Sequence, residues 1–207
     1  MGPKLLGTFT GGRLEEYIPK EIDNFRKLDM NGCVVTFCHN DLLAGNILLP
    51  EAHSGNIRSC SASTASNQKD IVFIEFEYAS YNYRGFDFAN HFIERAINYG
   101  KKTTPFYEIL PKNFPTEGQM LEFMYNYEKE GCPNASEEHL QESARTMVEE
   151  TAPFVPVSHL LWGIWGLFKG ASPSIEEFDY TSFAKYRLVE YYKTKDALKK
   201  IEGTDDN

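Results

Sequence analysis

The sequence lacks any run of about 20 apolar residues, the length that a membrane-spanning helix requires. Its amino terminus has no apolar segment of the kind that directs secretion. Its four cysteines show no paired spacing typical of zinc sites, and in a chain of this size we expect reduced thiols. These absences predict a cytoplasmic protein without a membrane span or a disulfide framework.

Positive charge is also scarce, because 21 Lys and Arg face 30 Asp and Glu, for a net charge of -9. Non-specific nucleic-acid binding depends on Lys and Arg that neutralise phosphates, so we expect no nucleic-acid partner. A negative surface potential concentrates cations and suits a cationic substrate. With 207 residues, 42% of them hydrophobic, the chain can form one domain with a sizeable core.

The stretch over residues 34–49 joins a β-branched run, a polar turn and a second apolar run. The turn carries His39, Asn40 and Asp41, and Asn46 follows the aspartate by five residues, which is the spacing of a kinase catalytic loop. Phosphoryl transfer to an alcohol needs a carboxylate that accepts the hydroxyl proton, with an oxygen ligand for Mg²⁺ beside it. The stretch therefore predicts such a loop, and the alternative is a polar hairpin that contains Asp and Asn by chance.

A second apolar strand is expected over residues 70–78. Strand alternation places Glu75 and Glu77 on one face, and two carboxylates that leave a buried strand together are costly unless they meet a cation. Both are candidate metal ligands, because a kinase needs a metal-binding carboxylate after its catalytic loop. The alternative is a strand end that reaches solvent.

The opening of the chain offers little for binding phosphate. Residues 1–19 are typical of two short strands around a glycine turn. A kinase needs a glycine-rich phosphate loop and a strand lysine, and neither precedes Asp41. Residues 50–69, rich in Ser, Ala, Thr and Asn, predict a flexible surface insert.

Helices are expected over most of the remaining chain. Asp87 is a candidate N-cap, and Thr116 with Gln119 has the spacing of a capping box. The expected helices cover residues 87–99, 116–130, 136–151 and 159–169, and a last helix begins at Ser174.

Two tryptophans, Trp162 and Trp165, lie three residues apart and share a face of one expected helix. Tryptophans at helical spacing commonly pack in a core. The alternative is an aromatic box for a quaternary ammonium, with cation–π attraction of about 0.5–2 kcal/mol per ring. Spacing alone leaves both readings open.

Together these stretches resemble the choline/ethanolamine kinase family. Three motifs in order carry the resemblance: the catalytic loop over 37–49, the glutamate- and tyrosine-rich segment over 76–92, and the tryptophan helix over 158–165. The resemblance implies an α+β fold, a protein-kinase-like carboxy-terminal lobe over residues 20–207 that is mostly helical, with short β hairpins at the hinge and the catalytic loop. Residues 1–19 are similar to the last amino-lobe strands and the hinge.

The family phosphorylates choline or ethanolamine with ATP and Mg²⁺, for the synthesis of phosphatidylcholine or phosphatidylethanolamine. The resemblance implies that Asp41 is the catalytic base, with His39 in the same catalytic loop. It implies metal ligands at Asn46 and at Glu75 and Glu77.

The resemblance also implies where the two substrates bind. The hinge would contact adenine through backbone groups of Glu16 and Ile18. Glu94 would supply a negative charge opposite the ammonium group. The amino-alcohol site would comprise Tyr78, Glu94, Tyr99, Trp162, Trp165 and Tyr180, with Phe178 and Phe183 near further aromatic positions.

Two departures from the family pattern affect these expectations. Glu75 stands where the family has a metal-binding Asp, and the added methylene predicts weakened Mg²⁺ binding. Most of the amino-lobe is missing, and the short segment 20–32 replaces a long helical stretch. We therefore expect a truncated form with weak or no activity alone.

Other interpretations stay open at this point. The chain could be a non-catalytic fragment that binds choline or dimerises, as a homodimer or with a full-length paralogue. An aminoglycoside phosphotransferase relative would share the catalytic loop, but it does not account for the tyrosine-rich segment and the tryptophan helix together. The sequence does not decide between choline and ethanolamine.

Overall fold

The computed structural model describes residues 5–9, 12–15, 33–49, 71–171 and 177–200. Strand β1 (Leu5–Phe9) pairs antiparallel with β2 (Gly12–Glu15), in agreement with the two strands expected at the start of the chain. The expected adenine contacts Glu16 and Ile18, the segment 20–32 and the insert over 50–69 lie outside the described residues.

Two short ladders flank the catalytic loop. Strand β3 (Val35–Cys38) pairs antiparallel with β6 (Ser80–Tyr83), and β4 (Ile47–Leu48) pairs antiparallel with β5 (Val72–Phe73). A single 3-10 turn, η1 (Ala44–Asn46), precedes β4. Each strand beside the loop is thus held by a partner far along the chain, so the loop is fixed at both ends.

The second apolar strand is shorter than the predicted stretch 70–78. It ends at Phe73, and Glu75 adopts φ 62°, which an extended strand does not allow. The prediction that alternation places Glu75 and Glu77 on one strand face is therefore wrong, because both residues follow the strand in an irregular segment.

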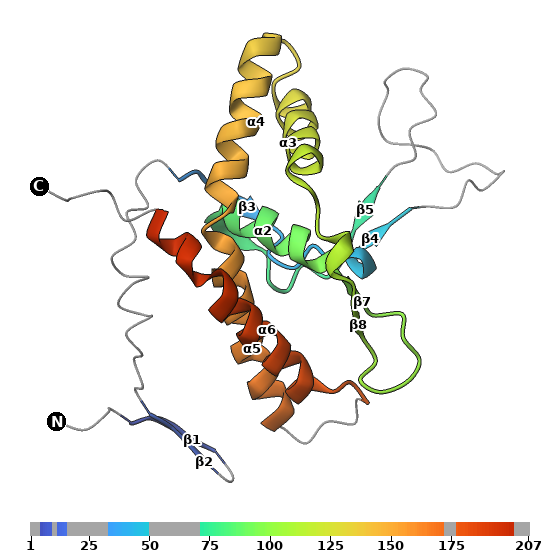
Figure 1. Ribbon diagram of the computed structural model, residues 1–207, viewed down its shortest axis with the longest axis vertical. Coiled ribbons are helices and arrows are strands. Elements are labelled where there is room, and N and C mark those ends of the chain that lie inside the picture. The colour runs from blue at the N-terminus through green and yellow to red at the C-terminus, as the bar shows by residue number, and fades with distance from the viewer. Residues whose placement is uncertain (1–4, 10–11, 16–32, 50–70, 172–176, 201–207) are drawn as a thin grey trace, which may run out of the picture.

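Five helices form the body of the described chain. Figure 1 shows α3 and α4 side by side at one end, α5 and α6 side by side at the other, and α2 between the two pairs. A two-stranded ladder of β7 (Ile97–Asn98) and β8 (Glu108–Ile109) follows α2, and 3-10 turns η2 (Pro111–Asn113) and η3 (Lys195–Lys200) lie before α3 and after α6. The five helices are α2 (Arg84–Glu94), α3 (Glu117–Gly131), α4 (Glu137–Thr151), α5 (Phe154–Ala171) and α6 (Tyr180–Thr194).

Local capping signals fixed two helix starts correctly. Thr116 and Gln119 form the reciprocal capping box at the start of α3. The Ser136 side chain accepts the backbone N–H of His139 at the start of α4. Both helices begin where their capping residues predict.

Two other predicted helix starts were wrong. Helix α2 begins at Arg84, before the expected N-cap Asp87. Helix α5 begins at Phe154, because Pro156 lies in the first turn, where no intrahelical donor is needed. Helix α6 begins at Tyr180, where the Asp179 carboxylate accepts the backbone N–H of Ser182, and the predicted start at Ser174 lies outside the described residues.

Helix α2 is the centre of the core. Phe92 packs against α3 and α4 through Met124 and Met147, all three fully buried. On the other side, Ile93 packs against Trp162 of α5 and Phe183 of α6. Because α2 is held from both sides, its side chains have fixed positions at the site.

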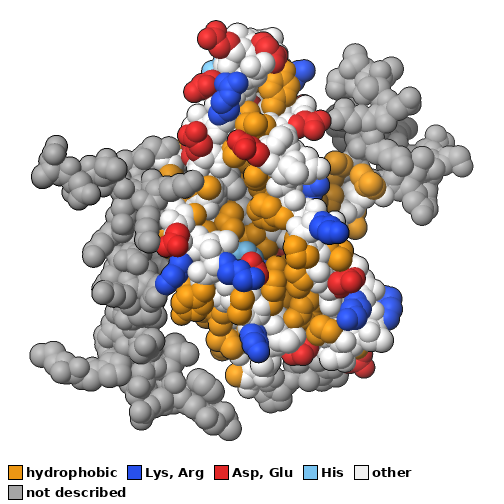
Figure 2. Space-filling model, in the orientation of Figure 1, with side chains coloured by type: hydrophobic (Ala, Val, Ile, Leu, Met, Phe, Trp, Pro, Cys, Tyr) orange, Lys and Arg blue, Asp and Glu red, His pale blue; other side chains and the backbone are white. Residues whose placement is uncertain are grey.

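The surface divides into two parts in one view. Charged side chains are dense over the end formed by α3 and α4, and exposed hydrophobic side chains gather over the middle and lower part of the same face (Figure 2). No helix within the described ranges has the length and apolar character needed to cross a bilayer.

Candidate active site

Hydrogen bonds from distant elements hold the catalytic loop. The Asp87 carboxylate of α2 accepts the backbone N–H of His39 at 3.0 Å and that of Asn40 at 2.8 Å. Asn40 has φ 64°, a left-handed conformation that asparagine tolerates better than most residues, and its Nδ2 donates to the Tyr78 carbonyl at 2.9 Å. These bonds fix the backbone that presents Asp41.

His39 supports the loop from behind. The Asp41 backbone N–H donates to His39 Nδ1 at 3.3 Å, so Nε2 carries the ring proton and donates to the Ile74 carbonyl at 2.9 Å. The ring is buried against Phe76 and does not line the cavity that contains the Asp41 side chain. Its place suits a role in positioning the loop.

Asp41 and Asn46 meet as the motif predicts. Asn46 Nδ2 donates to the Asp41 carbonyl at 2.9 Å and lies 3.4 Å from its carboxylate Oδ2. Burial, together with the nearby charges of Glu94 and Glu77, raises the pKa of Asp41 to about 7, against the hydrogen bond from Asn46 and the charge of Arg187. Two neighbouring carboxylates that raise the proton affinity of Asp41 suit a site that takes up a proton or a cation.

The two candidate metal ligands after β5 are placed differently. Glu77 lines the cavity beside Asp41, whereas Glu75 does not. Both side chains are exposed, and Glu75 sits at a left-handed φ that glutamate adopts less readily than aspartate or asparagine. In the described ranges, no three His, Cys, Asp or Glu side chains are grouped to hold a metal ion by themselves.

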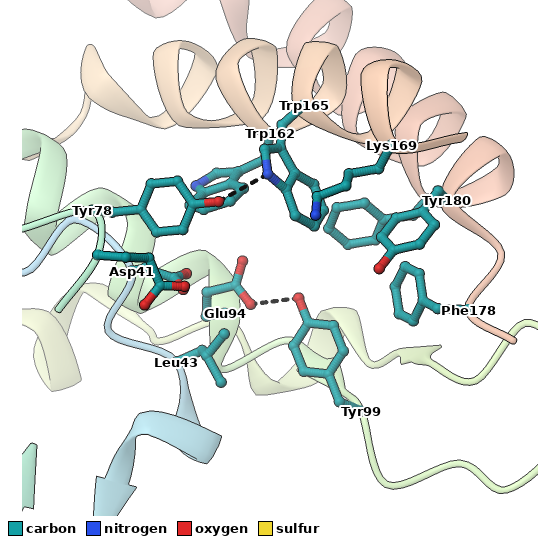
Figure 3. A pocket seen from close by; sticks show the side chains of 12 residues that line it. Asp41, Leu43, Tyr78, Glu94, Tyr99, Trp162, Trp165, Lys169, Phe178 and Tyr180 are labelled. Atoms are coloured by element: carbon teal, nitrogen blue, oxygen red, sulfur yellow. Dashed lines mark hydrogen bonds between the residues drawn. The ribbon is translucent and has the colours of Figure 1, made fainter. Parts of the chain in front are cut away.

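A cavity of about 370 Å³ opens between the catalytic loop, α2, α5 and α6. In Figure 3, Asp41 and Tyr78 lie at one end, Glu94 lies at the centre, and Phe178 and Tyr180 lie at the other. The lining residues are Asp41, Leu43, Glu77, Tyr78, Glu94, Tyr99, Trp162, Trp165, Lys169, Phe178, Tyr180 and Phe183. The structure thus brings together Asp41, Glu77 and all six residues expected in the amino-alcohol site.

The aromatic wall of this cavity is built on α5. The ring centroids of Trp162 and Trp165 lie 5.4 Å apart in an edge-to-face arrangement, and Trp165 Nε1 donates to the Tyr78 hydroxyl at 3.0 Å. Tyr180 continues the wall, with its ring 5.5 Å from that of Trp165. Trp162 belongs to the core, as the first reading predicts, and both indoles line the cavity, so the aromatic box stays a prediction.

Glu94 has its charge offset inside the protein. The side chain is 4% exposed, and its Oε1 accepts Arg187 NH1 at 3.0 Å while its Oε2 accepts the Tyr99 hydroxyl at 2.7 Å. Burial of its hydroxyl beside Glu94 raises the pKa of Tyr99 well above its usual range, although the outer part of its ring is exposed. The expected role of Glu94 as a counter-charge for the ammonium stays a prediction, and the structure adds Arg187 as its partner inside the protein.

Arg187 also joins this pair to the catalytic loop. Its NH2 donates to the Ser158 hydroxyl at 3.1 Å, and Ser158 donates to Asn90 at 2.9 Å. Asn90 in turn donates to the Asn40 carbonyl at 3.3 Å. Sequence reasoning missed Arg187 and Ser158, because a single buried arginine on an aromatic-rich helix gives no local signal.

Comparisons with known proteins agree with this geometry. The sequence model of the family described as Choline/ethanolamine kinase matches residues 18–192. The chain is 46% identical to choline kinase A2 of Caenorhabditis elegans over 197 residues, which cover 89% of this chain and 46% of that protein. It is 35% identical to choline/ethanolamine kinase of Homo sapiens over 195 residues, 92% of this chain and 46% of that protein.

Two solved structures share the fold. A choline kinase from Cryptosporidium parvum superposes with a TM-score of 0.63 at 23% identity, over 87% of this chain and 43% of that one. An ethanolamine kinase from Plasmodium vivax superposes with a TM-score of 0.60 at 23% identity, over 85% and 40%. The expected kinase-like fold is confirmed by these two structures. The chain spans less than half the length of each of the four relatives named above. With the family model matched over most of its length, the chain belongs to the choline/ethanolamine kinase family.

Proposed function

We propose that this chain carries the catalytic loop and the amino-alcohol site of a choline/ethanolamine kinase, which transfers a phosphoryl group from ATP to the substrate hydroxyl. One observation carries the proposal: a single cavity places the Asp41 carboxylate beside the indoles of Trp162 and Trp165. A small amino alcohol has a hydroxyl at one end and a cation at the other. The cavity offers a base for the first and aromatic faces for the second.

Asp41 has the properties of a general base. Its pKa of about 7 lies near neutral pH, where a base is most effective. In the proposed reaction Asp41 accepts the hydroxyl proton, the substrate oxygen bonds to the terminal phosphorus of ATP, and the bond to the bridging oxygen breaks to release ADP. Asn46 orients the Asp41 carboxylate through its amide, and His39 and Asp87 hold the loop.

The residues around Asp41 suit Mg²⁺. Mg²⁺ prefers oxygen ligands and uses one or two carboxylates together with substrate phosphates, where it neutralises developing charge. Asn46 Nδ2 is engaged with Asp41, and among the described residues no hydrogen bond uses its Oδ1. Asn46 Oδ1 with a carboxylate of Glu77 or Glu75 would hold the ion, and the left-handed backbone at Glu75 supports weakened binding by that residue. We propose Glu16 and Ile18 as the adenine contacts. We also propose that the protein is cytoplasmic.

The direct test is choline- or ethanolamine-dependent release of ADP by the purified chain, with Asp41→Ala as the control. We expect low turnover that Asp41→Ala abolishes. Equal turnover in both proteins would remove Asp41 from the mechanism.

A second candidate is a non-catalytic fragment that binds the amino alcohol and pairs with a second copy or a full-length paralogue. Exposed aromatic and aliphatic side chains beside the catalytic loop favour it: Val35 is 55% exposed, Phe37 61% and Tyr81 78%, and such patches mark interaction surfaces. Calorimetry with choline, with and without ATP and Mg²⁺, separates the two candidates. Choline binding without ATP binding favours the fragment, and tight ATP binding eliminates it.

A further inference from the structure

Lys169 brings a positive charge to the cavity. It follows Trp165 by one helical turn on α5, and its Nζ lies 5.5 Å from the centroid of the Trp165 ring. Figure 3 shows the side chain extending from α5 towards the Trp165 ring, with its nitrogen at the cavity. The ring that would wall a substrate cation thus already has a cation over it.

No carboxylate among the described residues holds this ammonium away from the ring. Lys169 takes part in none of the ion pairs within the described ranges, although Asp41, Glu77 and Glu94 line the same cavity. Its side chain is partly buried, and a lysine is charged at neutral pH. The attraction between an ammonium and an indole face therefore accounts for its position.

The cavity offers a bound cation two kinds of partner. Near its centre lies the Glu94 carboxylate, whose oxygens can accept further hydrogen bonds from N–H groups. The end near Trp165 and Tyr180 presents aromatic faces, together with the Lys169 ammonium. A primary ammonium has N–H donors and can bind at Glu94 while its hydroxyl stays at Asp41, whereas a trimethylammonium has no such donors and depends on the aromatic faces.

Resting on the proposed function, we infer that Lys169 is a specificity-determining residue that weakens binding of quaternary ammonium substrates relative to primary ones. A trimethylammonium group must share the Trp165 face with Lys169 or displace it, and like charges in a partly buried cavity repel. A primary ammonium at the Glu94 carboxylate avoids this competition. Lys169 therefore shifts the preference from choline towards ethanolamine.

The test is calorimetric titration of the full 207-residue chain with choline and with ethanolamine, in the wild type, Lys169→Met and Lys169→Arg. Methionine keeps the length of the side chain and removes its charge, and arginine keeps the charge. We expect Lys169→Met to tighten choline binding roughly 3- to 30-fold, the range of one cation–π contact, and ethanolamine binding less than about 3-fold. Lys169→Arg should resemble the wild type.

A neutral analogue separates charge from shape. In 3,3-dimethylbutan-1-ol a carbon replaces the nitrogen of choline, so its affinity should stay the same in Lys169→Met. Equal gains for choline and this analogue would assign the effect to side-chain shape and overturn the inference. An unchanged ratio of choline to ethanolamine affinity, with both still bound, would overturn it and leave the proposed function intact. Loss of all binding in wild type and variants that circular dichroism shows to be folded would overturn both.

Discussion

Asp41 and Glu94 face the same cavity, yet the structure treats their charges in opposite ways. Glu94 is almost fully buried and is paired with Arg187, and its second oxygen accepts the Tyr99 hydroxyl. The Asp41 carboxylate has a neutral donor, the amide of Asn46, and its pKa rises to about 7 because of burial and the neighbouring carboxylates. One carboxylate has a buried cationic partner, while the other can exchange a proton near neutral pH.

The difference shows what separates a structural acid from a reactive one. Both residues are carboxylic acids and both side chains line the cavity, so neither the type of group nor its distance from the cavity makes the difference. The separating feature is whether a buried cation offsets the charge. A carboxylate with a built-in counter-ion shapes the cavity, and one without it stays available to a proton or a metal ion.

The largest effect is expected from removing Arg187, the cation that pairs with Glu94. Arg187→Met leaves Glu94 buried and uncompensated, so the free energy of unfolding should fall by about 3–5 kcal/mol. Urea denaturation followed by circular dichroism measures this change. The double variant Arg187→Met with Glu94→Gln removes both charges and should recover most of the loss. If the single variant is as stable as the wild type, Arg187 does not compensate Glu94.

The next largest effect concerns Asp41, whose hydrogen-bond donor is neutral. Because the pKa of Asp41 is raised from 3.8 to about 7 on folding, the folded state binds the proton more tightly, and this carboxyl lowers stability as pH rises through that range. Asp41→Asn should therefore stabilise the chain by roughly 1–3 kcal/mol at about pH 8, after allowance for solvent screening, and by little at about pH 4.

Thermal melts of Asp41→Asn at the two pH values measure this difference. The control is Glu122→Gln, which removes an exposed carboxylate in the middle of α3 and should change stability little at both. A gain for Asp41→Asn that is the same at both pH values would show that the carboxylate is not under strain.

A smaller effect is expected at Asp87, which holds the loop that carries Asp41. Asp87→Asn keeps the shape of the side chain and removes one of the two oxygens that accept the loop amides of His39 and Asn40. Stability should fall by about 1–2 kcal/mol. Hydrogen exchange at those two amides should become faster while exchange in α3 stays the same. Unchanged exchange at the loop would mean that other bonds suffice to hold Asp41.

The smallest effect is expected at Trp165, in the aromatic wall of the cavity. Trp165→Leu removes one cation–π face, so tetramethylammonium should bind about 2- to 30-fold more weakly in calorimetric titrations. Leu161→Ala, on an exposed position of the same helix, is the control and should have no effect. Equal affinities in wild type and Trp165→Leu would leave the carboxylates as the main attraction for the cation.

Local signals in the sequence predicted a good part of this structure. The capping box at Thr116 acts within one turn, so its residues suffice to place the start of α3. The spacing of Trp162 and Trp165 likewise puts both indoles on one side of α5. The catalytic loop motif placed Asn46 correctly against Asp41, because only five residues separate them.

Signals that depend on distant partners could not be read in the same way. Asp87 has the residue type of an N-cap, but its carboxylate binds amides 47 and 48 residues earlier in the chain. Glu94 was expected to be a counter-charge for the ammonium, and its protein partner, Arg187, lies 93 residues further on and was not foreseen. Such contacts arise only once the helices pack.

The chain of buried hydrogen bonds from Glu94 through Arg187 and Ser158 to Asn40 has an evolutionary consequence. Each member satisfies its neighbour in a place that water does not reach, so a change at one position leaves another without a partner. Descendants of this protein should therefore alter these positions together or not at all, and the wall of the cavity and the loop that holds the base should be inherited as one unit.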